Sequence, residues 1–104
     1  MEYTVQLSEQ AKEDLFAIYT YIRNVLKSRI NADAFLGRMF SEIEKLNTMP
    51  SSYHLYPTEP WHSRGIHYFS VNDYSIFYHI NEDIHIVTVI HIIYGKRDLE
   101  KILD

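Results

Sequence analysis

The chain has 104 residues, 46% of them hydrophobic, and holds three glycines, three prolines and no cysteine. This length and composition predict one folded domain over residues 1–104, and the lack of cysteine excludes disulfide bonds and thiolate metal sites. No apolar run approaches the roughly 20 residues of a membrane-spanning helix, and the first residues do not resemble a signal peptide, so we expect a cytoplasmic protein without a membrane partner. The formal net charge of −4 disfavours strong binding to free nucleic acid, because such binding depends on many Lys and Arg contacts to phosphate.

The first predicted elements are a short strand over residues 3–7 and a long helix. Ser8 is a good helix N-cap, because its hydroxyl can accept a hydrogen bond from a free amide of the first turn. Acidic residues gather near the start of the helix and basic residues near its end, as the helix dipole favours. An apolar stripe at helical spacing predicts a helix from about residue 9 to residue 26: Ala11, Leu15, Ile18 and Ile22.

A second apolar stripe predicts a second helix: Ala32, Leu36, Met39, Ile43 and Leu46. Asn31 or Asp33 could cap its start, and Pro50 ends it. The connection between the two helices is short and polar, so they form an antiparallel hairpin. Residues 49–63 contain all three prolines. They form a loop that is long for a small domain, and such loops are often functional.

Three strands are predicted in the C-terminal half, over residues 65–71, 74–80 and 84–94. Asn and Asp occupy both connections, and these residues tolerate the left-handed backbone of tight turns. Strands joined by so few residues form an antiparallel meander, and the apolar stripes of both helices must be buried against it. The sequence therefore predicts an α+β fold with the order β-α-α-β-β-β, in which the helical hairpin packs on one face of a mainly antiparallel four-stranded sheet. The first strand joins this sheet at its edge or its centre.

The last strand run is apolar on both of its faces. Residues 84–93 are dominated by β-branched side chains, which is typical of a strand that is covered on both sides. The run ends at Tyr94, and Lys96 and Arg97 follow it. Two adjacent cations at a rigid strand end are candidates for binding phosphate, although a charged strand exit can also simply meet solvent. His91 lies within the run and is either a hydrogen-bonded core residue or an acid–base group.

The strand over residues 74–80 presents different side chains to its two faces. Its apolar set of alternate residues faces the helices, so Ser75, Phe77 and His79 face away from them. Together with Trp61 and Arg64 from the preceding loop, these residues form the predicted partner-binding surface, because apolar side chains left in water usually mark interaction sites. The alternative is an exposed polar strand face that carries one aromatic side chain.

Metal and cofactor sites are not predicted. The six histidines lie between residues 54 and 91, but no pair has the helical spacing of a zinc protease and no cysteine accompanies them. The chain contains neither a glycine-rich phosphate loop nor a nucleophile elbow. We therefore expect no metal and no cofactor.

Two stretches of the chain carry a family resemblance. The first is Ser8-x-x-Ala11-x-x-Asp14-Leu15-x-x-Ile18-x-x-Tyr21-Ile22, and the second runs over residues 65–78, 87–93 and 95–98. They resemble the first helix and the sheet of the ParE/RelE superfamily, the toxins of type II toxin–antitoxin (plasmid stabilisation) modules. The resemblance covers nearly the whole chain in order. It implies two helices packed on an antiparallel sheet, and a cognate antitoxin as partner.

The resemblance implies one of two activities. RelE-like toxins cleave messenger RNA in the ribosome with basic and aromatic residues on the open face of the sheet, whereas ParE-like toxins poison DNA gyrase and lack that catalytic set. Arg97 and Lys96 match the basic residues of the RelE-like pattern near the last strand. If the chain is such a ribonuclease, Arg97 is the principal phosphate ligand, and His91 or His79 supplies the acid–base chemistry with help from Tyr94.

Two departures from the RelE-like pattern favour the other activity. Ser75 stands where RelE-like toxins have an arginine, and Leu103 stands where they have a tyrosine. The sequence therefore favours a ParE-like toxin that inhibits an essential target such as DNA gyrase. The first alternative is a RelE-like ribosome-dependent messenger RNA endoribonuclease. A further alternative is a non-toxic protein-interaction module of the same fold.

Overall fold

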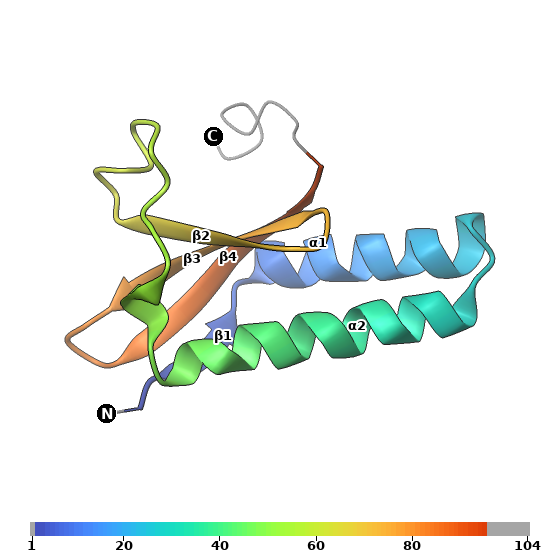
Figure 1. Ribbon diagram of the computed structural model, residues 1–104, viewed down its shortest axis with the longest axis horizontal. Helices are drawn as coiled ribbons and strands as arrows, with labels where there is room; N and C mark the ends of the chain where they lie inside the picture. The colour runs from blue at the N-terminus through green and yellow to red at the C-terminus, as the bar shows by residue number, and fades with distance from the viewer. Residues whose placement is uncertain (1, 96–104) are drawn as a thin grey trace.

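The computed structural model describes residues 2–95, which form a four-stranded sheet covered on one face by two helices (Figure 1). The strands lie in the order β1-β4-β3-β2, with β1 parallel to β4 and the other neighbours antiparallel. The predicted fold class is confirmed, and the first strand takes an edge of the sheet. The elements are β1 (Thr4–Leu7), α1 (Glu9–Thr20), α2 (Arg29–Glu44), β2 (Ile66–Val71), β3 (Tyr74–Asn81) and β4 (Ile86–Tyr94).

The helical hairpin follows the predicted stripes but differs in its caps. Ser8 caps α1 as predicted, since its side chain accepts a hydrogen bond from the amide of Ala11 at 3.0 Å. The predicted helix continues past α1 as a π-helical turn, η1 (Tyr21–Val25). The prediction that Asn31 or Asp33 caps the second helix is wrong. Ser28 takes this role, because α2 begins earlier than its apolar stripe and the Ser28 side chain accepts from the amide of Asn31 at 3.3 Å.

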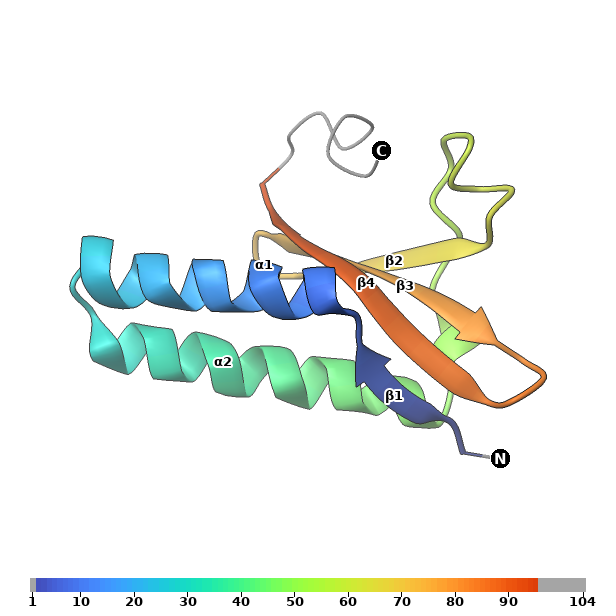
Figure 2. The ribbon, with the colours of Figure 1, turned by 180° about the vertical axis from the view of Figure 1, so that it is seen from behind.

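The main core lies between the helices and the sheet. Both helices run side by side along one face, and β1 leads directly into α1 at the sheet edge (Figure 2). Ile76 and Tyr78 of β3 are fully buried in this layer, and the Tyr78 hydroxyl donates a hydrogen bond to the Pro50 carbonyl. The core includes the apolar side chains Ala11, Leu15, Met39, Ile43, Leu46, Phe69, Val71, Val87, Val89 and Ile92.

Strand β4 begins two residues later than predicted. Ile84 is exposed and His85 has a left-handed backbone with φ of 53°. The Asn81 side chain accepts from the amides of Asp83 and Ile84 at 3.1 and 3.4 Å. These local hydrogen bonds extend the turn and delay the start of the strand.

No helix within residues 2–95 is long and apolar enough to cross a membrane.

Candidate functional site

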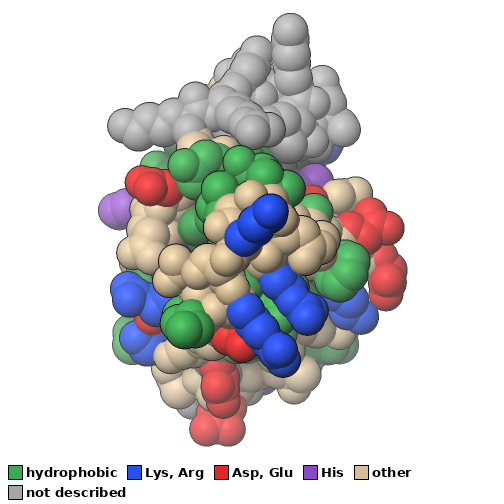
Figure 3. All heavy atoms as spheres, turned by 90° about the vertical axis from the view of Figure 1, so that its right-hand side faces the viewer, with side chains coloured by type: hydrophobic (Ala, Val, Ile, Leu, Met, Phe, Trp, Pro, Cys, Tyr) green, Lys and Arg blue, Asp and Glu red, His purple; other side chains and the backbone are tan. Residues whose placement is uncertain are grey.

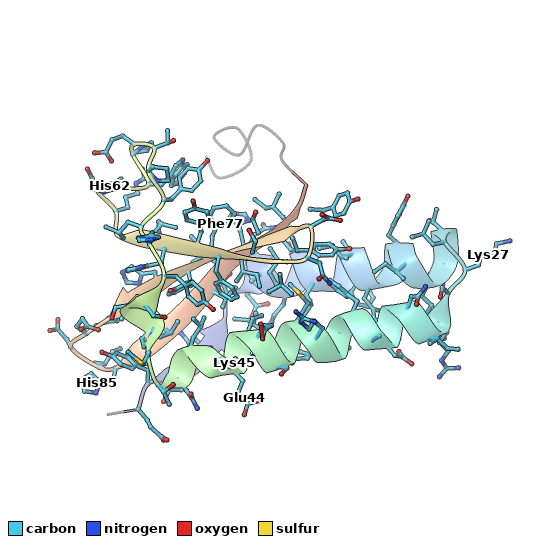
Figure 4. The ribbon with its side chains drawn as sticks, viewed as in Figure 1. Lys27, Glu44, Lys45, His62, Phe77 and His85 are labelled. Atoms are coloured by element: carbon cyan, nitrogen blue, oxygen red, sulfur yellow. The ribbon has the colours of Figure 1, made fainter. Side chains whose placement is uncertain are left out.

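The face of the sheet opposite the helices, called here the outer face, carries the predicted partner-binding residues of β3. Phe77 pairs with Tyr68 and His91 across the sheet, and Ser75 pairs with Ile93 on β4. Figure 4 shows Phe77 on the side of the sheet away from the helices. The predicted direction of these side chains is therefore confirmed.

The prediction that this surface leaves apolar side chains in water is wrong. Phe77 has no exposed surface and Trp61 is only 4% exposed, because the loop before β2 folds over the outer face. The loop is held by backbone hydrogen bonds from Tyr56 to the Ile66 carbonyl (2.7 Å) and from Tyr68 to the His54 carbonyl (3.1 Å). The covered side chains, called here the outer cluster, are Tyr56, Trp61, Ile66, Tyr68, Phe77, Ile90 and Ile93.

Trp61 is the centre of the loop that closes the outer cluster. The Arg64 guanidinium lies 5.0 Å from the centroid of the Trp61 ring, in the geometry of a cation–π contact. Glu59 accepts a hydrogen bond from the Ser63 amide at 2.7 Å, which ties the loop tip together. The indole Nε1 is buried and has no hydrogen-bond partner among residues 2–95. Arg64 itself is exposed, as are its neighbours His62 and Ser63.

The rest of the outer face is polar. His79 is exposed and pairs with Thr88 on β4. Gln6 donates from Nε2 to the Thr88 Oγ1 at 3.0 Å, so polar side chains cross β3, β4 and β1 in one row. Ser75 lies half-buried beyond the outer cluster. The outer face therefore divides into a covered aromatic half and a small polar half.

His91 is held by a residue that the sequence did not single out. Its Nδ1 lies 3.2 Å from the Asp14 Oδ2, and the same carboxylate oxygen accepts from the Ile92 amide at 3.1 Å. Burial raises the pKa of Asp14, but hydrogen bonds from His91, Ile92 and Gln10 outweigh it and hold the pKa below its usual value. The contact with Asp14 therefore fixes the position of the His91 ring against α1.

Asp14 and Ser8 form hydrogen bonds with the backbone of β4 where that strand carries a bulge. Phe77 faces His91 while Tyr78 faces Val89, so β4 carries one extra residue, Ile90. Strand β1 ends beside Val89, which leaves the next part of β4 without a strand neighbour on that side. Ser8 donates to the Ile90 carbonyl at 3.1 Å, and Asp14 accepts from Ile92. Two side chains from the start of α1 therefore satisfy the backbone of β4 beyond the end of β1.

Of the remaining catalytic candidates, Tyr94 lies in the described part of the chain. Tyr94 is half-exposed, and its ring lies 5.2 Å from that of Tyr74. Lys96 and Arg97 lie outside the described residues. Within residues 2–95, no group of three or more His, Asp or Glu side chains could hold a metal ion.

Comparison with known proteins identifies the family. The family model described as "ParE toxin of type II toxin-antitoxin system, parDE" matches residues 5–99. The chain belongs to the ParE toxin family. Comparison with the curated proteins gives no match.

Solved structures of toxin–antitoxin systems share the fold of this ParE-family toxin. A chain of the chromosomal ParDE system from P. aeruginosa has a TM-score of 0.74 and 16% identity, covering 90% of this chain and 97% of that one. A chain of the RelBE2 complex from Mycobacterium tuberculosis has a TM-score of 0.66 and 17% identity, covering 90% and 92%. A chain of the RelBE complex from E. coli has a TM-score of 0.57 and 14% identity, covering 91% and 99%.

The strands of this ParE-family toxin carry no acidic side chain, no lysine and no arginine. The cation nearest to the outer cluster among the described residues is Arg64, and it stacks on Trp61. Asp14 belongs to the helix motif that carries the family resemblance, but the sequence gives no sign of its contacts, because its partners lie 77 and 78 residues further along the chain.

Proposed function

We propose that this protein is a ParE-like toxin that blocks growth by binding a protein target such as DNA gyrase, without catalysing a reaction. It acts in the cytoplasm and is neutralised by a cognate antitoxin. The observation that carries the proposal is the outer face of the sheet, which is filled by the outer cluster and presents no cation on its strands.

The chemistry of RNA cleavage explains why this observation matters. A ribonuclease of the RelE type must stabilise a pentacoordinate phosphate with additional negative charge, and it needs a base for the 2′-hydroxyl and an acid for the leaving oxygen. On the outer face, the side chains of Phe77 and Trp61 are buried and uncharged. Neither side chain carries a charge that a phosphate could bind, so this face gives little support to catalysis.

The family match and the fold agree with this proposal. Structures of the ParDE and RelBE systems share the architecture, so the fold alone does not choose between the two activities. Ser75 on the outer face, in place of the arginine of the RelE-like pattern, supports the ParE-like activity.

A ribosome-dependent ribonuclease is the second candidate, and one observation favours it. Asp14 fixes the ring of His91 through Nδ1, which is how a carboxylate orients a histidine for proton transfer. In that case His91, Tyr94, Lys96 and Arg97 form the catalytic set. Arg97 then provides the principal positive charge that stabilises the transition state.

The deciding experiment is induced expression with parallel measurement of DNA breaks and protein synthesis. We expect growth arrest with DNA damage signalling, relief of the arrest by the antitoxin encoded beside the toxin, and inhibition of supercoiling by purified DNA gyrase. The double variant Lys96→Ala with Arg97→Ala should keep its toxicity. Rapid loss of messenger RNA, together with a loss of about 100-fold or more in toxicity in the double variant, would establish the ribonuclease instead. If neither wild type nor the double variant arrests growth at matched protein levels, the remaining hypothesis is the non-toxic interaction module.

A further inference from the structure

The end of the helical hairpin extends beyond the sheet and is covered with apolar side chains. Residues 21–30, called here the hairpin tip, comprise η1, the connection to α2 and the first turn of α2. Figures 1 and 2 both show this end of the hairpin clear of the strands. Four large apolar side chains of the hairpin tip are between 53% and 82% exposed: Tyr21, Val25, Leu26 and Ile30.

The hairpin tip is also the cationic end of an acidic chain. Arg23, Lys27 and Arg29 are all exposed there, and no acidic residue occurs between Asp14 and Asp33. The whole chain has a formal net charge of −4, so the hairpin tip is positively charged although the protein as a whole is negatively charged. Figure 3 views the molecule from this end and shows Lys and Arg side chains gathered with hydrophobic ones on the same face.

The backbone of the hairpin tip departs from regular helix twice. Residues Tyr21–Val25 form a π-helical turn, and such turns are frequent at functional sites. Lys27 follows the C-cap Leu26 and has a positive φ of 53°, the left-handed conformation with which helices commonly end. The chain therefore reverses sharply at the hairpin tip.

Local contacts brace the hairpin tip in spite of its exposure. Ile22 is buried beneath it, and the Ser28 amide donates to the Ile22 carbonyl at 3.2 Å. Tyr19 donates to the Asp33 carboxylate at 2.9 Å and joins the two helices just below the tip. A surface that is ordered before binding loses less conformational entropy when a partner docks on it.

We propose that the hairpin tip is the part of the toxin that inserts into its protein target, at a cleft with an apolar floor and an acidic rim. This inference rests on the proposed function, and it assigns the target-binding surface to the tip rather than to the outer face. The apolar side chains match the floor, and Arg23, Lys27 and Arg29 match the rim by charge complementarity. The tip is a projecting end of the molecule, so it suits a concave surface on a larger protein.

Other partners fit the hairpin tip less well. Nucleic acid would use the cations but leave most of the aliphatic surface of Val25, Leu26 and Ile30 in water, because most contacts to nucleic acid go to phosphate and sugar. An anionic membrane would attract three cations but repel a chain of net charge −4. An acidic cleft on a protein satisfies both the charge and the apolar surface.

The test compares two double variants that keep the fold. The tip variant combines Arg29→Glu with Ile30→Ser. Arg29 is the first residue of α2, where an acidic side chain favours the helix dipole, and Ile30 is 82% exposed, so neither change removes core packing. The control variant combines Lys12→Glu with Ile84→Ser. It makes the same two kinds of change, a charge reversal on α1 and the loss of an exposed isoleucine in the turn before β4, away from the hairpin tip.

We measure growth arrest on induction, inhibition of purified DNA gyrase, co-purification with the antitoxin and the thermal midpoint Tm. The tip variant should be at least about 10-fold weaker in growth arrest and in gyrase inhibition, while its Tm and antitoxin binding stay unchanged. The control variant should match wild type in all four. Inhibition by wild type should also weaken with added salt, and the tip variant should lose most of that salt dependence.

Four results would overturn the inference. Full growth arrest by the tip variant would remove the tip from target binding, and a parallel loss of antitoxin binding would make it an antitoxin surface. Binding of wild type, but not of the tip variant, to phosphatidylglycerol vesicles would point to a membrane. Self-association of wild type, but not of the tip variant, would point to a second copy of the chain as the partner of the tip. Failure of wild type to arrest growth at all would instead reject the proposed function, and the inference would fall with it.

Discussion

Asp14 is the residue through which α1 controls the irregular end of β4. Its carboxylate contacts both the His91 ring and the Ile92 amide. Asp14→Ala would leave this amide without its partner in a half-buried position. We therefore expect the free energy of unfolding to fall by about 1–3 kcal/mol at pH 7, measured by urea denaturation. Asp14→Asn should lose less, because its amide oxygen can still accept from Ile92.

The Asp14 contribution should depend on pH with a definite sign. The folded state holds the pKa of Asp14 below its ordinary value of 3.8, so the ionised form is the one that folding favours. The stabilisation from ionised Asp14 is present above that ordinary value and is lost as the pH falls through the lower folded pKa. The difference between wild type and Asp14→Ala should therefore be largest near neutral pH and shrink below about pH 4. A difference that stays constant down to pH 2 would contradict this role.

At the scale of elements, the loop that crosses the outer face changes the role of Phe77. The sequence predicts an exposed interaction residue, and a charged substitution there would then test partner binding without harming the fold. Because Phe77 has no exposed surface, such a substitution would bury a charge and unfold the protein. Phe77 therefore belongs to the stability of the fold and cannot report on binding.

The outer cluster should be worth several kcal/mol to the folded state. Phe77→Ala removes a fully buried ring, so we expect the free energy of unfolding to fall by about 3–5 kcal/mol in a denaturant titration. Ser70→Ala is the matched control, because Ser70 is exposed on β2 of the same sheet and its change should stay within about 0.5 kcal/mol. Equal effects of the two substitutions would show that the loop does not cover Phe77 in solution.

The two halves of the fold differ in how well sequence predicts them. The helices and strands follow from apolar spacing, since Leu15 and Met39 lie on periodic stripes and are buried as predicted. The burial of Phe77 does not follow from apolar spacing. The loop of residues 49–63 that covers Phe77 has no periodicity, and Trp61 is buried only by tertiary folding. The extra residue at Ile90 and its partner Asp14 are equally non-local. The fold was therefore predictable, and the burial of the candidate site was not.

At the scale of the whole molecule, charge is separated between a cationic hairpin tip and the remaining acidic surface. Lys27 at the tip and His85 beside β4 mark opposite ends in Figure 4. The strands between them carry no Lys or Arg. The cations of the hairpin tip are thus too few and too localised to follow a nucleic-acid backbone, which a protein usually contacts through many phosphates.

This separation predicts weak binding to free nucleic acid. Fluorescence anisotropy with a labelled single-stranded RNA and a labelled DNA duplex should show no saturable binding below about 100 μM protein at physiological salt, since non-specific affinities of even basic proteins lie near 10⁻⁴–10⁻⁶ M. Any residual binding should disappear in the tip variant, because Arg29 supplies part of the local charge. Micromolar binding with a steep salt dependence that the tip variant retains would require a second cationic surface. It would favour the ribonuclease, with Lys96 and Arg97, over the ParE-like toxin.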